Sequence, residues 1–193
     1  MAYVPPKKRF GQHYLNDEQV LLDIIQLLKD NHQSNSLLEV GPGMGALTQY
    51  IWRDFKDQLR LIELDKRCVK YLEGHYQGMA EKLTQGDFLK FDLNEFLQEP
   101  TTIIGNFPYN ISSQIIFKII ESEAIVPLVI GMFQKEVGVR LAAKPGSKSY
   151  GVISVLAQLK YEIDVAFHIG PEKFDPPPKV NSSVIIMLSL IHI

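Results

Sequence analysis

The strongest constraint on the fold is an alternation of short apolar runs with amphipathic stretches between residues 19 and 132. Apolar residues in the amphipathic stretches are spaced three and four apart, which is the period of a helix with one buried face. This alternation predicts a mostly parallel sheet with helices on both faces. The predicted strands cover residues 36–40, 59–64, 82–85, 101–105 and 128–132, and the predicted helices cover residues 19–29, 47–55, 66–75 and 113–121.

The pattern changes after residue 132. Two predicted helices, 136–143 and 150–160, are separated by a Lys-Pro-Gly-Ser turn. Two further predicted strands, 161–168 and 184–190, flank a proline-rich connection that contains no long helix. Such a connection favours antiparallel pairing at one edge of the sheet. The sequence therefore predicts an α/β domain whose sheet has about seven strands, most of them parallel.

The composition excludes several classes of protein. The 193 residues are 46% apolar and 22% charged, as in a globular domain rather than a disordered segment. No apolar stretch could span a bilayer and the N-terminus lacks the apolar core of a signal peptide, so we expect a cytoplasmic protein with no membrane segment. The single cysteine, Cys68, excludes an internal disulfide, and five histidines without ligand-like spacing predict no metal site.

The net charge of −2 is low for a protein that binds nucleic acid over its whole surface. Two local clusters are positive, one formed by residues 7–9 and the other by Lys144 and Lys148. Taken alone, such clusters are more often solvated surface charge than phosphate-binding sites.

A glycine-rich segment, residues 39–45 with the sequence EVGPGMG, ends the first predicted strand. Glycines at this place let the backbone turn sharply and approach a ligand closely, although a lone Gly-x-Gly-x-Gly is weak evidence. No Lys-Ser/Thr follows, so the segment is not a P-loop. Glu39 would repel a pyrophosphate but suits a positively charged sulfonium, and the predicted cofactor is S-adenosylmethionine.

Acidic residues follow the next two predicted strands. Glu63 ends the second strand, where a carboxylate can accept hydrogen bonds from both hydroxyls of a ribose. Asp65 is predicted to cap the next helix instead. Asp87 follows the third strand, where its carboxylate can bind an adenine amine beside an aromatic or aliphatic side chain. Because the ends of parallel strands meet at one edge of the sheet, these groups are expected to face one crevice.

The fourth predicted strand ends in the sequence NFPY at residues 106–109. The lone pair of adenine N6 is delocalised into the ring, and two acceptors near its hydrogens would localise it. The amide oxygen of Asn106 and the carbonyl of Pro108 can serve as these acceptors. Tyr109 can stack on a base that has swung out of its helix or loop. Alone the tetrapeptide would be an ordinary turn, but beside the crevice it predicts amine methylation that depends on alignment rather than on a strong base.

With these motifs in order, the chain resembles the ribosomal RNA adenine dimethyltransferases that act on the small subunit. The resemblance covers about residues 7 to 188 and implies a class I S-adenosylmethionine-dependent methyltransferase fold of the Rossmann-like type. It rests on residues 10–15, 39–48, 63, 86–88, 106–113, 134–137, 143–148, 150–151, 174, 176–180 and 182–184.

The resemblance implies dimethylation of two adjacent adenosines near the 3′ end of small-subunit (16S) rRNA, in a pre-30S particle during ribosome biogenesis. Separately, the protein is expected to be monomeric. It also assigns residues to the site. The positions that match cofactor contacts are His13, Leu15, Gly41, Glu63, Asp87 and Asn106. The target-amine site is matched by Asn106, Pro108 and Tyr109, and Phe174 matches an aromatic residue that closes on the target base.

Three departures from the family pattern are visible. Phe107 stands where Leu or Ile is usual and is expected to face the core, and His13 stands where Asn is usual. The segments implied are a basic N-terminal arm (1–17), a catalytic domain (18–188) and a tail outside the family pattern (189–193). The helical domain that follows in the family, and helps to bind the RNA, is expected to be absent.

Two alternative functions stay open. Related methyltransferases modify large-subunit rRNA and confer macrolide resistance, but the sequences YGVISV at 150–155 and NFPYNIS at 106–112 favour the small-subunit group. A ribosome-assembly factor that acts by binding is the alternative from another class, and the presence of Glu63, Asp87 and Asn106 argues against it.

Overall fold

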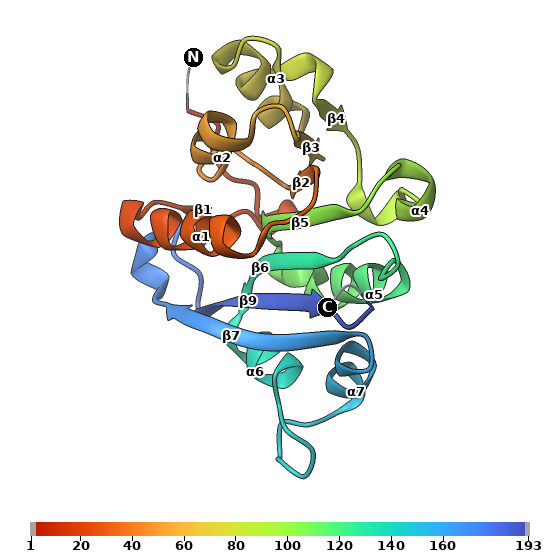
Figure 1. Cartoon of the computed structure of the whole chain (residues 1–193). Coiled ribbons are helices and arrows are strands. Elements are labelled where there is room, and N and C mark those ends of the chain that lie inside the picture. The colour runs from red at the N-terminus through yellow and green to blue at the C-terminus, as the bar shows by residue number, and fades with distance from the viewer. Residues whose placement is uncertain (1–2, 192–193) are drawn as a thin grey trace.

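The computed structural model describes residues 3–191, which fold around one seven-stranded sheet (Figure 1). The strand order is β4-β3-β2-β5-β6-β9-β7. Strands β2 to β6 are parallel, whereas β9 is antiparallel to both β6 and β7. The predicted α/β class and the antiparallel edge are therefore confirmed. The strands are β2 (Ser36–Val40), β3 (Leu59–Glu63), β4 (Leu83–Gln85), β5 (Thr101–Asn106), β6 (Leu128–Gln134), β7 (Tyr161–Ile169) and β9 (Ser182–Ser189).

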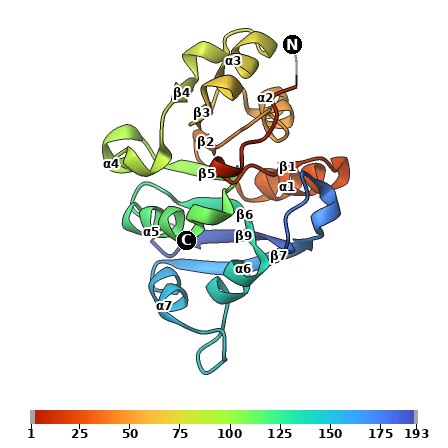
Figure 2. The ribbon, with the colours of Figure 1, turned by 180° about the vertical axis from the view of Figure 1, so that it is seen from behind.

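Helices cover both faces of this sheet (Figure 1, Figure 2). Side chains alternate between the faces along each strand, so Leu37 of β2 packs with the first three helices and Leu38 packs with the last four. Each face therefore has its own apolar core. The helices are α1 (Glu18–Asn31), α2 (Thr48–Phe55), α3 (Lys66–His75), α4 (Leu93–Phe96), α5 (Ser112–Glu121), α6 (Lys135–Leu141) and α7 (Val152–Gln158).

Two aspartates fix where helices begin. Asp17 accepts a hydrogen bond from the backbone N–H of Val20 and starts α1, and Asp65 accepts one from Arg67 and starts α3. Both side chains satisfy N–H groups that have no partner inside the helix. The capping role predicted for Asp65 is confirmed.

A second, two-stranded sheet was not predicted. The antiparallel pair of β1 (Tyr14–Leu15) and β8 (Phe174–Asp175) joins the N-terminal arm to the segment before β9. Next to it, the N–H of Asn16 donates to the carbonyl of Lys173 at 2.8 Å, and the Lys173 ammonium forms an ion pair with Asp17. Because these strands have two residues each, no periodic pattern in the sequence could indicate them.

The strand order places a crevice at one end of the sheet. The chain adds β3 and β4 on one side of β2, and then crosses to add β5 and β6 on the other side. In open α/β sheets, ligands bind where this reversal separates the carboxyl ends of neighbouring strands. The segments that follow β2, β3, β4 and β5 all meet there.

Among residues 3–191, no helix is long and apolar enough to cross a membrane. Residues 1–2 of the expected arm and 192–193 of the expected tail lie outside the described residues.

Phe107 is buried, as expected, and two glycines make room for its ring. Its ring stacks on Phe133 with centroids 4.9 Å apart. A Cβ at Gly131 would lie 2.5 Å from a Phe107 ring atom and 2.6 Å from a Phe133 ring atom, and a Cβ at Gly105 would lie 3.2 Å from Phe107. The larger side chain at position 107 is thus accommodated by missing side chains on β5 and β6.

The substitution Gly131→Ala is therefore expected to lower the free energy of unfolding by about 1–3 kcal/mol, because the core is already filled. Urea denaturation followed by circular dichroism measures the change. In a Phe107→Leu background one of the two close ring contacts is relieved, so the loss caused by Gly131→Ala should be smaller. An equal loss in both backgrounds would contradict this explanation.

Candidate active site

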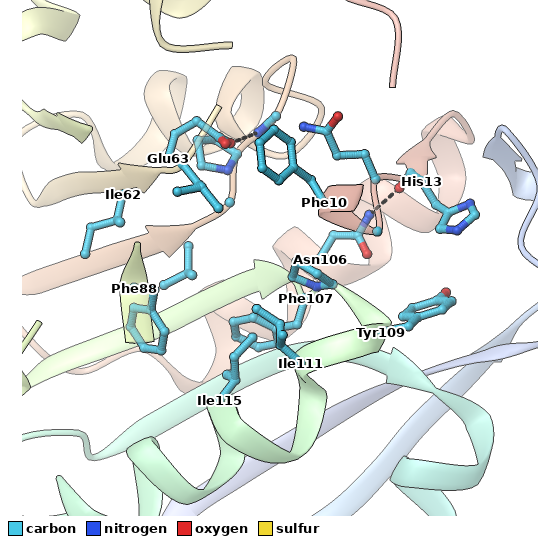
Figure 3. Close-up of a pocket in the computed structure, with 18 of the residues that line it drawn as sticks. Phe10, His13, Ile62, Glu63, Phe88, Asn106, Phe107, Tyr109, Ile111 and Ile115 are labelled. Carbon is cyan, nitrogen blue, oxygen red and sulfur yellow. Dashed lines mark hydrogen bonds between the residues drawn. The ribbon is translucent and has the colours of Figure 1, made fainter. Parts of the chain in front are cut away.

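A cavity of about 330 Å³ lies at the carboxyl ends of the parallel strands (Figure 3). Its size is within the range of small-molecule sites, roughly 300 to 1,000 Å³. The N-terminal arm forms one wall, and the four segments that follow strands β2 to β5 form the others. The lining residues fall in segments 9–15, 39–47, 62–64, 86–89 and 106–115.

The glycine-rich segment after β2 is one of the walls of the cavity. Gly41 has φ 68°, in the left-handed region. Apart from its chain neighbours, no described residue has an atom within 4 Å of the position that a Cβ would take at Gly41. Gly43 has φ 57°, and its N–H donates to Oε2 of Glu63 at 2.9 Å. Glycine is the residue that adopts this conformation without strain, and at Gly41 it also leaves room for a ligand against the backbone.

Glu63 lies at the end of β3, buried under the glycine segment (Figure 3). Oε2 accepts from Gly43, and Oε1 accepts from the N–H of Asp65 at 2.7 Å. Burial raises the pKa of Glu63, and the backbone N–H donors oppose that shift. Each carboxylate oxygen can accept more than one hydrogen bond, so the oriented carboxylate can still bind the two hydroxyls of a ribose.

Glu39, at the end of β2, is the second buried acid that lines the cavity. Its Oε2 accepts a hydrogen bond from the Thr48 hydroxyl at 2.7 Å. The pKa of Glu39 is raised to about 8 as the net result of three effects: burial raises it most, the bond from Thr48 lowers it, and the charge of Glu63 raises it. A cationic group bound beside Glu39 would favour the ionised carboxylate, as we expected for a sulfonium.

The raised pKa of Glu39 predicts a pH-dependent stability. The folded chain keeps the proton between 4.5, the ordinary pKa, and about 8, whereas the unfolded chain loses it. The contribution of this group to stability is therefore fully present below 4.5 and is lost as the pH rises to about 8. Urea denaturation across this interval should show a smaller decline in Glu39→Gln than in the wild type. Some decline remains, because burial also raises the pKa of Glu63. Equal declines in both proteins would contradict the assignment.

An apolar slot lies beyond the carboxylates. Ile62 and Phe88 line it, with Ile115 of α5 on the far side (Figure 3). At its edge, Asp87 accepts a hydrogen bond from the N–H of Leu89 at 3.1 Å and so caps a short helix. Only one carboxylate oxygen of Asp87 makes this bond, so the other can accept a hydrogen bond from a ligand. The apolar side chains of the slot beside it suit the faces of an adenine ring.

Asn106 ends β5 and is held by the N-terminal arm. Its Nδ2 donates to the backbone carbonyl of His13 at 2.8 Å (Figure 3). Since the amide nitrogen is engaged in this way, Oδ1 is the atom left to accept a hydrogen bond from a ligand. The Pro108 carbonyl, the other predicted acceptor, already accepts from the N–H of Ile111 at 3.2 Å and from the hydroxyl of Ser112 at 3.3 Å.

Tyr109 and Phe174 have different surroundings. Tyr109 lines the cavity, its ring stacks on His13, and its hydroxyl forms a hydrogen bond with Ser182. Phe174 is buried in the core opposite Leu15 and does not line the cavity. The structure therefore does not bring Phe174 to the site, because pairing of β8 with β1 turns its side chain into the core. Leu15 is also buried, but it lines the cavity.

Several residues around the cavity were not identified from the sequence. Phe10 and Tyr14 line it, and the hydroxyl of Ser182 reaches Tyr109. The guanidinium of Arg9 lies over the Phe10 ring, 4.6 Å from the centroid. In the sequence, the resemblance to the family already assigned His13 and Leu15 of this wall to the site, whereas the basic residues 7–9, taken alone, are most simply explained as solvated charge.

The fold and the cavity define a Rossmann-like methyltransferase domain. The acid at the end of β3 suits a ribose, the slot beyond it suits an adenine ring, and Glu39 suits a positive charge. Across residues 3–191, no three His, Cys, Asp or Glu side chains are close enough together to hold a metal ion.

Comparisons with known proteins identify the family. The sequence model of the family described as "Ribosomal RNA adenine dimethylase" matches residues 5–191. A "Ribosomal RNA small subunit methyltransferase A" from Cytophaga hutchinsonii is 44% identical over 185 residues, which are 96% of this chain and 72% of that protein. A protein of the same name from Parabacteroides distasonis is 46% identical over 187 residues, 97% of this chain and 70% of that protein. The chain belongs to the ribosomal RNA adenine dimethylase family, and its methyl donor is S-adenosylmethionine.

Solved structures agree with the fold. A dimethyladenosine transferase from Plasmodium falciparum matches with a TM-score of 0.77 at 27% identity, over 93% of this chain and 64% of that chain. The 23S rRNA methyltransferase ErmE also matches with a TM-score of 0.77, over 91% of this chain and 69% of that chain. At 23% identity the second match supports the fold alone.

Proposed function

We propose that this chain dimethylates N6 of adenosines in small-subunit ribosomal RNA. The observation that carries the proposal is the orientation of Asn106, whose amide nitrogen is bound to the His13 carbonyl at 2.8 Å. Oδ1 is thereby available to an amine at the edge of a cavity suited to a methyl donor. The names of the relatives supply the class of RNA.

S-adenosylmethionine, when bound, supplies an activated methyl group on a sulfonium, so no strong base is needed. Glu63 would hold its ribose, Asp87 the adenine amine, and Gly41 would leave room for it against the backbone. His13 and Leu15, which line the cavity from the arm, are the further contacts we propose.

On the RNA side, Asn106 Oδ1 accepts a hydrogen bond from the target amine and favours localisation of its lone pair. Tyr109 stacks on the flipped base. The Pro108 carbonyl contributes as a second acceptor when one of its two internal hydrogen bonds opens. Closure of Phe174 over the base would require its side chain to leave the core.

The finer description of the substrate follows from the resemblance. The substrate is two adjacent adenosines near the 3′ end of 16S rRNA, in a pre-30S particle, and the protein acts as a cytoplasmic monomer. Residues 18–188 form the catalytic domain, and the N-terminal arm is part of the site because residues 9–15 line the cavity.

The test is methyl transfer from methyl-labelled S-adenosylmethionine. Unmethylated small-subunit particles and free large-subunit rRNA are offered separately, and the modified nucleotides are identified by mass spectrometry. We expect dimethyladenosine in the small-subunit particle. Label in large-subunit rRNA only would replace our choice with the macrolide-resistance group. Tight binding to particles without any transfer would favour an assembly factor.

A further inference from the structure

We infer that the ring of Tyr109 is held in its base-stacking orientation by two residues outside the NFPY tetrapeptide, His13 and Ser182. This inference rests on the proposed function, in which Tyr109 stacks on the target adenine. His13 and Ser182 are therefore positioning residues that act through Tyr109.

His13 connects three segments at the mouth of the cavity. Its ring stacks on Tyr109 with centroids 5.6 Å apart and an interplanar angle of 22° (Figure 3). Its Nδ1 lies 2.7 Å from the carbonyl oxygen of Pro176, and its backbone carbonyl accepts from Asn106. One residue of the arm thus contacts both the residue that binds the amine and the residue that stacks on the base.

Ser182 holds the other end of the tyrosine side chain. It is fully buried at the start of β9, where it pairs with Gln134 of β6 and Ile169 of β7. Its hydroxyl forms a hydrogen bond with the hydroxyl of Tyr109. Because Ser182 lies between two strands, its position is fixed by the sheet and not by a flexible loop.

These contacts fix Tyr109 before RNA binds. His13 covers one face of the ring, so a base that stacks on Tyr109 takes the other face and completes a three-layer stack. A ring that is already oriented has less freedom to lose when the base arrives. This arrangement also gives the histidine at position 13 a role that the Asn usual in the family could not have, because Asn has no ring to stack on Tyr109.

The first experiment separates the ring of His13 from its hydrogen bond. His13→Asn removes the stack, whereas His13→Phe keeps a ring and removes the bond to Pro176. For small-subunit particles we expect His13→Asn to lower kcat/KM by about 2- to 10-fold, the range for loss of one aromatic pair. His13→Phe should recover most of this loss. Both variants are assayed at saturating S-adenosylmethionine, with the affinity measured by calorimetry, because the proposed function also gives His13 a contact with the cofactor.

The chain offers a matched control for this substitution. His75 stacks on Tyr71 with centroids 3.9 Å apart, and its Nδ1 lies 2.8 Å from the Tyr71 carbonyl. This pair lies on α3, outside the residues that line the cavity. His75→Asn removes the same kind of stack and should leave methyl transfer unchanged.

The second experiment tests Ser182. Ser182→Ala should lower kcat/KM for particles by about 2- to 10-fold, as expected for loss of one buried hydrogen bond. Ser183→Ala is its control, since the adjacent Ser183 is equally buried and bonds through its hydroxyl to His168 at 2.7 Å.

A readout without RNA keeps this inference separate from the proposed function. In protein labelled with 3-fluorotyrosine, the ¹⁹F resonance that disappears in Tyr109→Phe belongs to Tyr109. That resonance should shift in His13→Asn and Ser182→Ala, but not in the two control variants. An unshifted resonance in the free protein overturns the inference, whether or not the wild type methylates RNA.

The kinetic outcomes decide the role of the contacts. If His13→Asn increases kcat/KM, the His13 ring occupies the place of the base and the inference is wrong. If His13→Asn transfers methyl groups at the wild-type rate once S-adenosylmethionine is saturating, the His13 ring acts only on cofactor binding and the inference is again wrong. If the wild type binds S-adenosylmethionine but methylates no RNA, the proposed function fails while the ¹⁹F result still reports on the contacts of Tyr109.

Discussion

Replacing Asn106 with alanine is expected to reduce methyl transfer to small-subunit particles by roughly 100- to 1,000-fold, the cost of losing one oriented hydrogen-bonding group in a transition state. The substitution removes Oδ1, the acceptor for the target amine, and also removes the donor that binds the His13 carbonyl at 2.8 Å. Single-turnover transfer of labelled methyl groups measures the rate. Binding of S-adenosylmethionine should survive at least partly, because Glu63 and Asp87 are unchanged.

A second substitution separates the two roles of Asn106. Asn106→Asp keeps an acceptor oxygen but cannot donate to the His13 carbonyl, so its activity should lie between those of Asn106→Ala and the wild type. Calorimetry with S-adenosylmethionine and circular dichroism check that both variants bind cofactor and are folded. If cofactor binding falls as steeply as transfer, Asn106 is a cofactor residue and its assignment to the target amine is wrong.

The second large effect is expected at Glu63. Glu63→Gln should weaken S-adenosylmethionine binding by about 10- to 100-fold, because hydrogen bonds to a charged acceptor are among the strong ones. The two carboxylate oxygens accept from Gly43 at 2.9 Å and from Asp65 at 2.7 Å. A glutamine has one acceptor oxygen, so its NH₂ group would face one of these N–H donors and the glycine segment would lose its anchor.

Isothermal calorimetry measures this affinity, and transfer at saturating cofactor shows whether the chemical step is preserved. We expect a large change in affinity and a change of a few-fold at most in the saturated rate. Glu73→Gln, on the exposed face of α3, is the control for loss of one negative charge. An affinity equal to that of the wild type would show that Glu63 binds only the backbone N–H groups of Gly43 and Asp65 and not the cofactor.

Much of the sheet could be predicted because its strands are buried on both faces. Residues 36–40 are all buried, and so are residues 101–105, which form β5 together with Asn106. Once these strands are parallel, their carboxyl ends must share one edge, which places Glu63, Asp87 and Asn106 around one cavity. Periodicity and strand direction were sufficient for this part of the site.

The N-terminal arm could not be predicted in this way. Residues 8–15 contain a short helix and a two-residue strand, and neither is long enough to show a period. The place of the arm is set by contacts with distant residues, such as the pairing of Leu15 with Phe174. The same pairing places Phe174 in the core, which the resemblance to the family did not indicate.

The sequence by itself determined the class of fold, the edge of the sheet that carries the site and the residues at the strand ends, because these follow from local period and from strand direction. Only the tertiary structure decided how the groups are oriented. Asn106 is bound by a residue 93 positions away, and Tyr109 by one 73 positions away. Burial beside Glu63 also raises the pKa of Glu39 to about 8. Such contacts depend on how the folded chain brings distant segments together, and no local pattern records them.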